Sequence, residues 1–181
     1  MRLFFSLPLP AEARERLRGP LERARAVCGR SLSFANPAQL HFTLAFLGEQ
    51  DEAALERARE AASRVKQPTF DVDIARAGAF PSLSRPRVVW LGLRQGAPEL
   101  SNLAGALREE LAHNRVSFDD KPFRPHLTIA RLKSRGRVPG EALTLFETCA
   151  ATAHASEFHL VHSEGGRHET LHSFPLEPHA M

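Results

Sequence analysis

Two short segments of the sequence repeat one arrangement of a histidine and a threonine. Residues 41–44 and residues 126–129 each read histidine, apolar residue, threonine, aliphatic residue. The chain holds nine histidines and seven threonines, so two such segments arise by chance roughly one time in several hundred. A single copy would indicate no more than the polar face of a half-exposed strand. The pair predicts that the two segments act together.

The chemistry that this pair could perform follows from strand geometry. Residues two apart on a strand point the same way, so His41 shares a face with Thr43, and His126 shares one with Thr128. If the two strands lie side by side, two imidazoles and two hydroxyls line one cleft. A neutral imidazole can accept a proton from water while an imidazolium protonates a departing alkoxide. Threonine hydroxyls can donate hydrogen bonds to phosphoryl oxygens. The pattern predicts acid–base opening of a phosphodiester without a metal.

The fifth residue after each histidine is a second candidate pair. Phe46 follows His41 and Arg131 follows His126 at this distance. Five residues along a regular strand is the opposite face, so these side chains reach the cleft only if each strand ends or twists. An aromatic ring and a guanidinium that face each other could hold a nucleobase between them. The alternative is that Phe46 packs in the core and Arg131 is a solvated charge.

The remaining pattern predicts the elements that must position these residues. Apolar residues at helical spacing predict helices over 12–28, with Pro20 as a kink or break, from Asp51 as N-cap to about 66, and over 98–113. Alternating or continuous apolar runs predict strands at 2–7, 40–47, 70–75, 87–93, 126–132, 143–148, 157–162 and 170–174. Residues 78–82 are typical of a loop. Strands mixed with three helices predict an α+β fold with mostly antiparallel sheet, in one domain over 1–181.

Composition sets limits on the class of protein. A hydrophobic content of 43% with 25% charged residues is typical of a globular chain. No apolar run approaches the roughly 20 residues that span a bilayer, and the short apolar start is predicted to be a strand rather than a signal peptide. Two cysteines, Cys28 and Cys149, are predicted to be buried free thiols, so we expect a cytoplasmic protein. The formal net charge of +3 permits a polyanionic substrate without establishing one.

Several cofactor classes find no support in the sequence. Five histidines lie between residues 154 and 172, but their spacing fits no standard zinc site and predicts surface or strand-face positions. No glycine-rich loop of the nucleotide-triphosphate or dinucleotide kind is present in the sequence. We therefore expect no metal, no cofactor and no use of ATP, and we expect a monomer.

Beyond these local patterns, nearly the whole chain resembles the 2H phosphoesterase superfamily, and within it the bacterial and archaeal RNA 2′,3′-cyclic phosphodiesterases, long called 2′-5′ RNA ligases. The matching segments are residues 2–5 (RLFF), 37–49 (PAQLHFTLAFLGE), 78–81 (GAFP), 85–92 (RPRVVWLG), 122–131 (PFRPHLTIAR) and 174–176 (FPL). The lead-in PFRP to the second motif is especially specific. Two departures concern the rim of the cleft. Residues 32–36 lack the tryptophan that the family often has, and His168 stands where an aromatic residue is common.

The resemblance implies a fold of two pseudosymmetric lobes with the active site between them. It implies that His41 protonates the departing ribose O3′ and that His126 serves the attacking water and the phosphate. Thr43 and Thr128 match phosphate-contacting threonines, while Phe46 and Arg131 match positions that flank the terminal base. The implied substrate is an RNA end with a 2′,3′-cyclic phosphate, and the implied product is a 2′-phosphate.

Two alternatives stay open on the sequence alone. The same acid–base pair serves 2′-5′ ligation of a cyclic phosphate end to a 5′-hydroxyl, so the physiological direction is not fixed. A non-catalytic nucleotide- or RNA-binding module could retain the same cleft. The presence of both His41 and His126 favours the enzyme, because function is argued from the site rather than from the fold.

Overall fold

The computed structural model describes residues 1–133 and 138–178 of the chain. Within these residues it has nine strands, four α-helices and one 3-10 helix. The strands are β1 Arg2–Pro8, β2 Leu32–Phe34, β3 His41–Glu49, β4 Phe70–Ser82, β5 Arg85–Gln95, β6 Leu127–Leu132, β7 Ala151–Ala155, β8 Glu157–Glu164 and β9 Arg167–Pro175. The helices are α1 Ala11–Cys28, α2 Glu52–Ser63, α3 Ala97–His113 and α4 Gly140–Glu147, with η1 Pro37–Gln39 as the 3-10 helix.

All nine described strands belong to one sheet, whose order is symmetric about its middle. The order is β7-β4-β5-β6-β3-β1-β8-β9, with β2 paired to β6 off this path. Along this path four strands lie on each side of the junction between β6 and β3, with β2 as a ninth strand beside β6. Every pairing between these strands is antiparallel. This confirms the predicted α+β fold and its two pseudosymmetric lobes.

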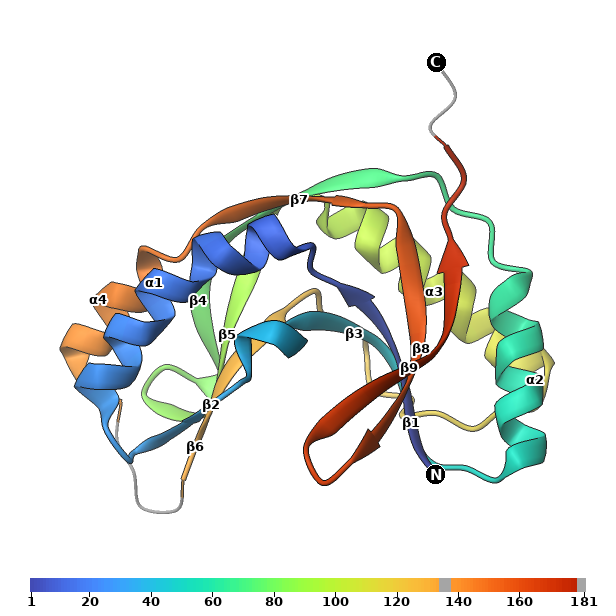
Figure 1. Ribbon diagram of the computed structural model, residues 1–181, viewed down its shortest axis with the longest axis horizontal. Coiled ribbons are helices and arrows are strands. Elements are labelled where there is room, and N and C mark those ends of the chain that lie inside the picture. Colours follow the sequence, from blue (N-terminus) through green and yellow to red (C-terminus); the bar gives the residue numbers. More distant parts are fainter. Residues whose placement is uncertain (134–137, 179–181) are drawn as a thin grey trace.

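The helices are exchanged between the two halves of the chain. Helix α1 from the first half packs against α4 from the second half, and α3 from the second half packs against α2 from the first. Figure 1 shows the α1–α4 pair on one side of the molecule and the α2–α3 pair on the other. Each lobe therefore needs both halves of the sequence, which explains why the two halves share one continuous hydrophobic core.

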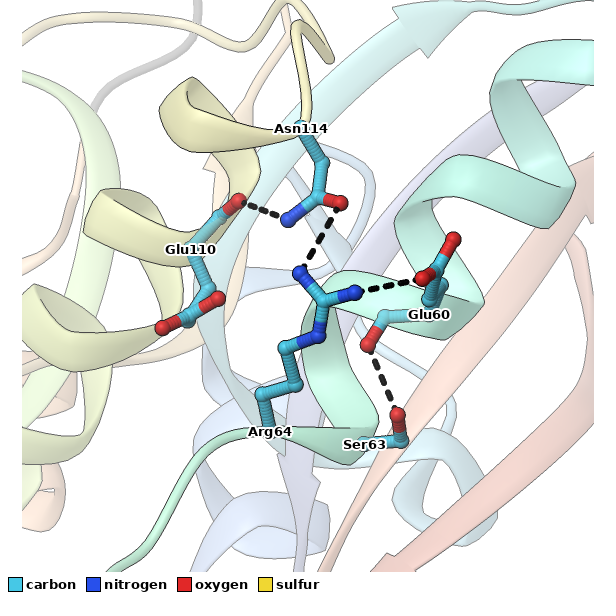
Figure 2. Close-up of polar contacts among 5 residues, drawn as sticks. All are labelled: Glu60, Ser63, Arg64, Glu110 and Asn114. Atoms are coloured by element: carbon cyan, nitrogen blue, oxygen red, sulfur yellow. Dashed lines mark hydrogen bonds and ion pairs between the residues drawn. The ribbon is translucent and has the colours of Figure 1, made fainter.

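The pairing of α2 with α3 is reinforced by polar contacts at their carboxyl ends. The Arg64 guanidinium pairs with the Glu60 carboxylate and donates across to Asn114 Oδ1 at 3.4 Å, while Asn114 Nδ2 donates to the Glu110 carbonyl at 2.7 Å (Figure 2). The Glu110 carbonyl also accepts from the Asn114 backbone amide at 3.0 Å, so Asn114 closes the carboxyl end of α3 and the Arg64 side chain links it to α2. At the other end of α2, Asp51 accepts a hydrogen bond from the Ala54 amide at 2.7 Å, which confirms the predicted N-cap.

Most predicted elements are confirmed, and two are wrong. Residues 78–82 are not a loop: β4 continues through them and pairs with β5, with Gly78 opposite Trp90. Gly78 is needed there for close packing rather than for a turn, because a Cβ atom would lie 2.3 Å from the Trp90 ring.

The second wrong prediction is the strand at 143–148. These residues lie in or directly after helix α4, in which the buried Ala142 and Phe146 are one helical turn apart. The many apolar residues of this segment suggested a strand, but the four-residue spacing of the two buried side chains is that of a helix. Strand β7 escaped prediction because its Ala-Thr-Ala-His-Ala sequence has few residues that favour strands. Helix α1 continues past Pro20, where a kink or break was expected.

Cys28 and Cys149 are buried free thiols, as predicted. Of the helices in residues 1–133 and 138–178, none combines the length and the apolar character that a membrane crossing requires.

Candidate active site

The two repeated segments meet at the junction between the lobes. Strands β3 and β6 pair antiparallel with Phe42 opposite Leu127. The two strands run in opposite directions, so His41 lies on the same side of this pair as Thr128, and Thr43 lies on the same side as His126. A cleft of about 520 Å³ opens here. Its lining includes all six residues singled out from the sequence: His41, Thr43, Phe46, His126, Thr128 and Arg131.

A β-bulge in each strand brings the fifth residue into the cleft. In the pairing of β1 with β3, Thr43 and Ala45 lie opposite consecutive residues, so Leu44 is the extra residue of a bulge. In the pairing of β5 with β6, Ile129 is extra in the same way. A bulge reverses the alternation of side chains beyond it. Phe46 and Arg131 therefore emerge on the same side as the histidines, and a regular strand would have placed them opposite.

Both histidines are held in the same tautomer by the same kind of hydrogen bond. His41 Nδ1 lies 2.7 Å from the Gln39 carbonyl, and His126 Nδ1 lies 2.6 Å from the Arg124 carbonyl. A carbonyl oxygen can only accept, so Nδ1 carries the proton in each ring. Nε2 is then the atom of each imidazole that remains to exchange a proton with a ligand.

Aromatic neighbours fix the plane of the His41 ring. Phe4 of β1 stacks on it with ring centroids 5.0 Å apart, and His168 of β9 meets it edge-on at 5.3 Å. The Gln39 amide, in the orientation that satisfies both its atoms, donates to the Gly166 carbonyl at 3.2 Å and accepts from the His168 amide at 3.0 Å. Gln39 therefore connects the β8–β9 hairpin to the backbone carbonyl that orients His41.

His126 has its own aromatic support on the opposite lobe. Phe80 of β4 meets its ring edge-on at 5.0 Å, and Trp90 of β5 lies 6.4 Å away. Trp90 packs over Gly78, which gives the indole its space. The glycine of the supposed loop thus contributes indirectly to the position of His126.

Burial lowers the pKa of both imidazoles below the usual value for histidine. For His41, the bond to the Gln39 carbonyl raises the pKa in part and the neighbouring His168 lowers it further. For His126, the bond to the Arg124 carbonyl raises the pKa in part and the charge of Arg131 lowers it further. Each imidazole of the free protein therefore loses its proton at a lower pH than an exposed histidine does.

These directions predict the pH dependence of kcat/KM. The acid–base pair expected from the sequence needs one imidazole charged and the other neutral, so its rate should fall at low pH, when both are charged, and at high pH, when both are neutral. Because both pKa values are lowered, we expect a bell with its maximum below a pH of about 6.5. Initial rates at substrate concentrations well below KM, measured across the histidine range, test this. A maximum on the alkaline side, or one limb only, would contradict it.

Three further residues in the cleft escaped the sequence analysis. Arg2 was expected only as the first residue of a strand, yet it lines the cleft and its guanidinium lies over the Phe46 ring at 5.1 Å. Gln39 had no signal beyond its place before the first motif. His168 was set aside with the other carboxy-terminal histidines, although the resemblance did mark its position as one where an aromatic residue is common. That mark is the signal that could have found it.

The other four histidines of that group are not part of the described lining of the cleft, and two of them pair with carboxylates elsewhere. His154 pairs with Asp71 at 2.7 Å, and His159 pairs with Glu157 at 2.8 Å. Over residues 1–133 and 138–178, no cluster of three or more histidine, cysteine, aspartate or glutamate side chains is arranged to hold a metal ion.

Comparison with known proteins identifies the family. The pattern of the 2′-5′ RNA ligase superfamily matches residues 9–167. The chain belongs to this superfamily. The resemblance of the sequence to 2H phosphoesterases is thereby confirmed. One relative is the RNA 2′,3′-cyclic phosphodiesterase of Archaeoglobus fulgidus. It is 37% identical over 136 residues, which cover 75% of this chain and 74% of the relative.

A second relative and two solved structures are also similar to this chain. The RNA 2′,3′-cyclic phosphodiesterase of Escherichia coli K12 is 38% identical over 136 residues, covering 72% of this chain and 71% of the relative. The crystal structure of E. coli LigT complexed with 3′-AMP matches with a TM-score of 0.74 at 31% identity, covering 97% of both chains. A crystal structure from Thermus thermophilus matches with a TM-score of 0.80 at 29% identity, covering 99% of this chain and 100% of the other.

Proposed function

We infer that this protein is an RNA 2′,3′-cyclic phosphodiesterase, which opens the cyclic phosphate at an RNA end and leaves a 2′-phosphomonoester. The observation that carries this inference is the matched pair of imidazoles. Each has its Nδ1 proton held by the carbonyl of the residue two positions earlier, and each belongs to the lining of one cleft. Two imidazoles with free Nε2 atoms are the parts that proton transfer at a phosphodiester needs.

The proposed reaction gives each residue one task. His126, as the neutral imidazole, accepts a proton from the attacking water at Nε2. His41, as the imidazolium, protonates O3′ as the bond from phosphorus to O3′ breaks. Thr43 and Thr128 donate hydrogen bonds to the non-bridging oxygens, where negative charge increases in the transition state. Hydrolysis leaves the phosphate on O2′ and exchanges the roles of the two histidines, which solvent then restores.

The test is product formation by the purified chain after exhaustive chelation. We expect a cyclic-ended oligonucleotide to be opened to the 2′-phosphate, and we expect chelation to leave turnover in place because the residues assigned above need no Lewis acid. Loss of turnover with chelator that zinc or manganese restores would overturn the metal-free assignment. A 3′-phosphate product would reverse the assignment of the leaving oxygen. Binding without turnover would favour the non-catalytic RNA-binding alternative.

We propose that the terminal base lies between Phe46 and Arg131. Phe46→Ala should weaken binding of cyclic-ended RNA by about 1–3 kcal/mol, the usual value of a base stacked on an aromatic ring. The measurement is the KM together with the affinity for a non-hydrolysable 3′-end analogue. Phe46→Tyr keeps a stacking face and serves as the matched control. An alanine variant with the KM of the unmodified protein would remove Phe46 from the base site.

We propose that the protein acts on RNA in the cytoplasm. The free thiols of Cys28 and Cys149 suit a reducing compartment, where structural disulfides are rare.

A further inference from the structure

A second pocket, of about 420 Å³, borders His126. It shares Thr43, Phe46 and His126 with the cleft described above, so the two cavities border the same reacting groups. His41 is absent from the described lining of this second pocket. The pocket therefore adjoins one imidazole of the pair and not the other.

The wall of this pocket combines aromatic rings with positive charge. The Arg124 guanidinium lies over the Phe80 ring at 5.9 Å. Arg108 lies over the Phe123 ring at 5.7 Å and is fixed by donating to two backbone carbonyls, Leu44 O at 3.2 Å and Lys121 O at 2.8 Å. Aromatic faces next to cations are the chemistry that holds a base and its phosphate.

The charge balance of the lining favours an anion. Three cations, Arg108, Lys121 and Arg124, contribute to the described lining together with one carboxylate, Asp119. Asp119 is paired with the Lys121 ammonium at 3.0 Å. The described lining therefore has an excess of two positive charges, carried by the guanidiniums of Arg108 and Arg124. Phosphate is a group that guanidinium matches well.

We propose that this pocket binds the nucleoside whose 5′-oxygen is attached to or attacks the phosphorus, and we call it the acceptor pocket (Thr43, Phe80, Phe123, Arg124, His126). The proposal rests on the function proposed above, in which His126 serves the attacking oxygen. Water needs no pocket of this size beside that imidazole. The leaving O3′ belongs to the terminal ribose itself, so the donor end needs no second nucleoside site beside His126.

The step that the acceptor pocket serves balances in both directions. In ligation, the 5′-hydroxyl oxygen forms a bond to phosphorus and passes its proton to His126, while the bond from phosphorus to O3′ breaks and His41 protonates O3′. In the reverse direction, the 3′-hydroxyl attacks phosphorus and passes its proton to His41, while His126 protonates the departing 5′-oxygen. The 3′-phosphate that continues the acceptor strand would then meet Arg124.

The experiment compares two substrates that differ only in the group on the 5′ side. One is a 2′-5′-linked dinucleoside monophosphate, and the other is the 2′-methyl phosphodiester of the same first nucleoside, which leaves the acceptor pocket empty. The quantity measured is the ratio of their kcat/KM values for cleavage to the 2′,3′-cyclic phosphate. We expect Phe123→Ala to lower this ratio by about 5- to 150-fold, the equivalent of one lost base stack.

A second variant covers the case in which Phe123→Ala fails to fold, because Phe123 packs partly against the core. Arg124→Gln keeps the backbone carbonyl that orients His126 and removes the exposed guanidinium together with its contact to the Phe80 ring. With a 2′-5′-linked substrate that carries a further 3′-phosphate, it should lower the same ratio. Arg57→Gln, an exposed arginine on α2, is the matched loss of charge away from the pocket and should leave the ratio unchanged.

Hydrolysis of a cyclic mononucleotide by the unmodified protein distinguishes failure of the proposed function from failure of the acceptor pocket. If that hydrolysis is absent, the proposed function fails. If it is present and both variants keep the ratio of the unmodified protein, the acceptor pocket alone is refuted. If the variants weaken only long cyclic-ended RNA relative to the cyclic mononucleotide, the pocket holds the preceding nucleotide of the donor strand, which also overturns the proposal.

Discussion

Replacing either His41 or His126 with alanine is expected to lower kcat/KM for a cyclic-ended RNA by about 10²–10⁴-fold, the usual contribution of a positioned acid or base. The structure gives the reason. Each ring has one nitrogen committed to a backbone carbonyl and one left for the ligand. The double variant should lose much less than the product of the two factors, because residues that act as one unit are not additive.

A substrate with a good leaving group distinguishes the two roles. A nitrophenyl phosphodiester releases a phenolate that needs no proton, so it should rescue His41→Ala more than His126→Ala. Rescue of His126→Ala instead would exchange the acid and the base. Rescue of neither would mean that the imidazoles mainly hold the phosphate. His113→Ala, at an exposed position at the end of α3, is the matched histidine control and should keep full activity.

Replacing Thr43 or Thr128 with valine should lower kcat by about 10²–10³-fold each, as for other hydrogen-bond donors to a developing oxyanion. Valine preserves the branched shape at Cβ and replaces the hydroxyl with a methyl group. The effect should appear in kcat more than in KM, because the hydrogen bond strengthens as charge develops on the phosphate. Steady-state rates with a cyclic mononucleotide provide the measurement.

Serine at the same positions is the control for this prediction. Thr43→Ser and Thr128→Ser keep the donor and lose a methyl group, so most of the activity should return. Serine variants as impaired as the valine variants would mean that the threonines shape the strands rather than contact the phosphate. Valine variants with full activity would contradict a role for the hydroxyls altogether.

The sequence predicted the meeting of the two motifs because strand periodicity and a duplicated pattern are local signals. It missed the parity of Phe46 and Arg131, since a β-bulge depends on the neighbouring strand. Each bulge coincides with two consecutive apolar residues, Leu44 with Ala45 and Ile129 with Ala130. Both members of each pair are buried, where regular alternation would expose one.

Other errors have a common physical origin in packing between distant segments. Gly78 was taken as a loop signal, but its role depends on Trp90 twelve residues later. The position of His168 in the cleft depends on the pairing of β8 with β9 and on the contact with Gln39. The exchange of helices between lobes is equally invisible to local patterns, since nothing within α1 specifies that α4 is its partner.

The near-symmetry of the sheet has a consequence for how a substrate enters. Strand β3 contributes His41 and Thr43, and β6 contributes Thr128 with His126 directly before it, so a phosphate alone meets a similar set of groups in two orientations related by a half-turn. The two sides differ beyond these groups: Phe46 and Arg131 line the cleft, and His41 contacts Phe4 and His168. His126 has Phe80 and Trp90 beside it instead. If the function proposed above holds, we expect the residues that contact the nucleoside to decide the polarity of the bound strand, and an exchange of the side chains at positions 46 and 131 to favour the opposite polarity.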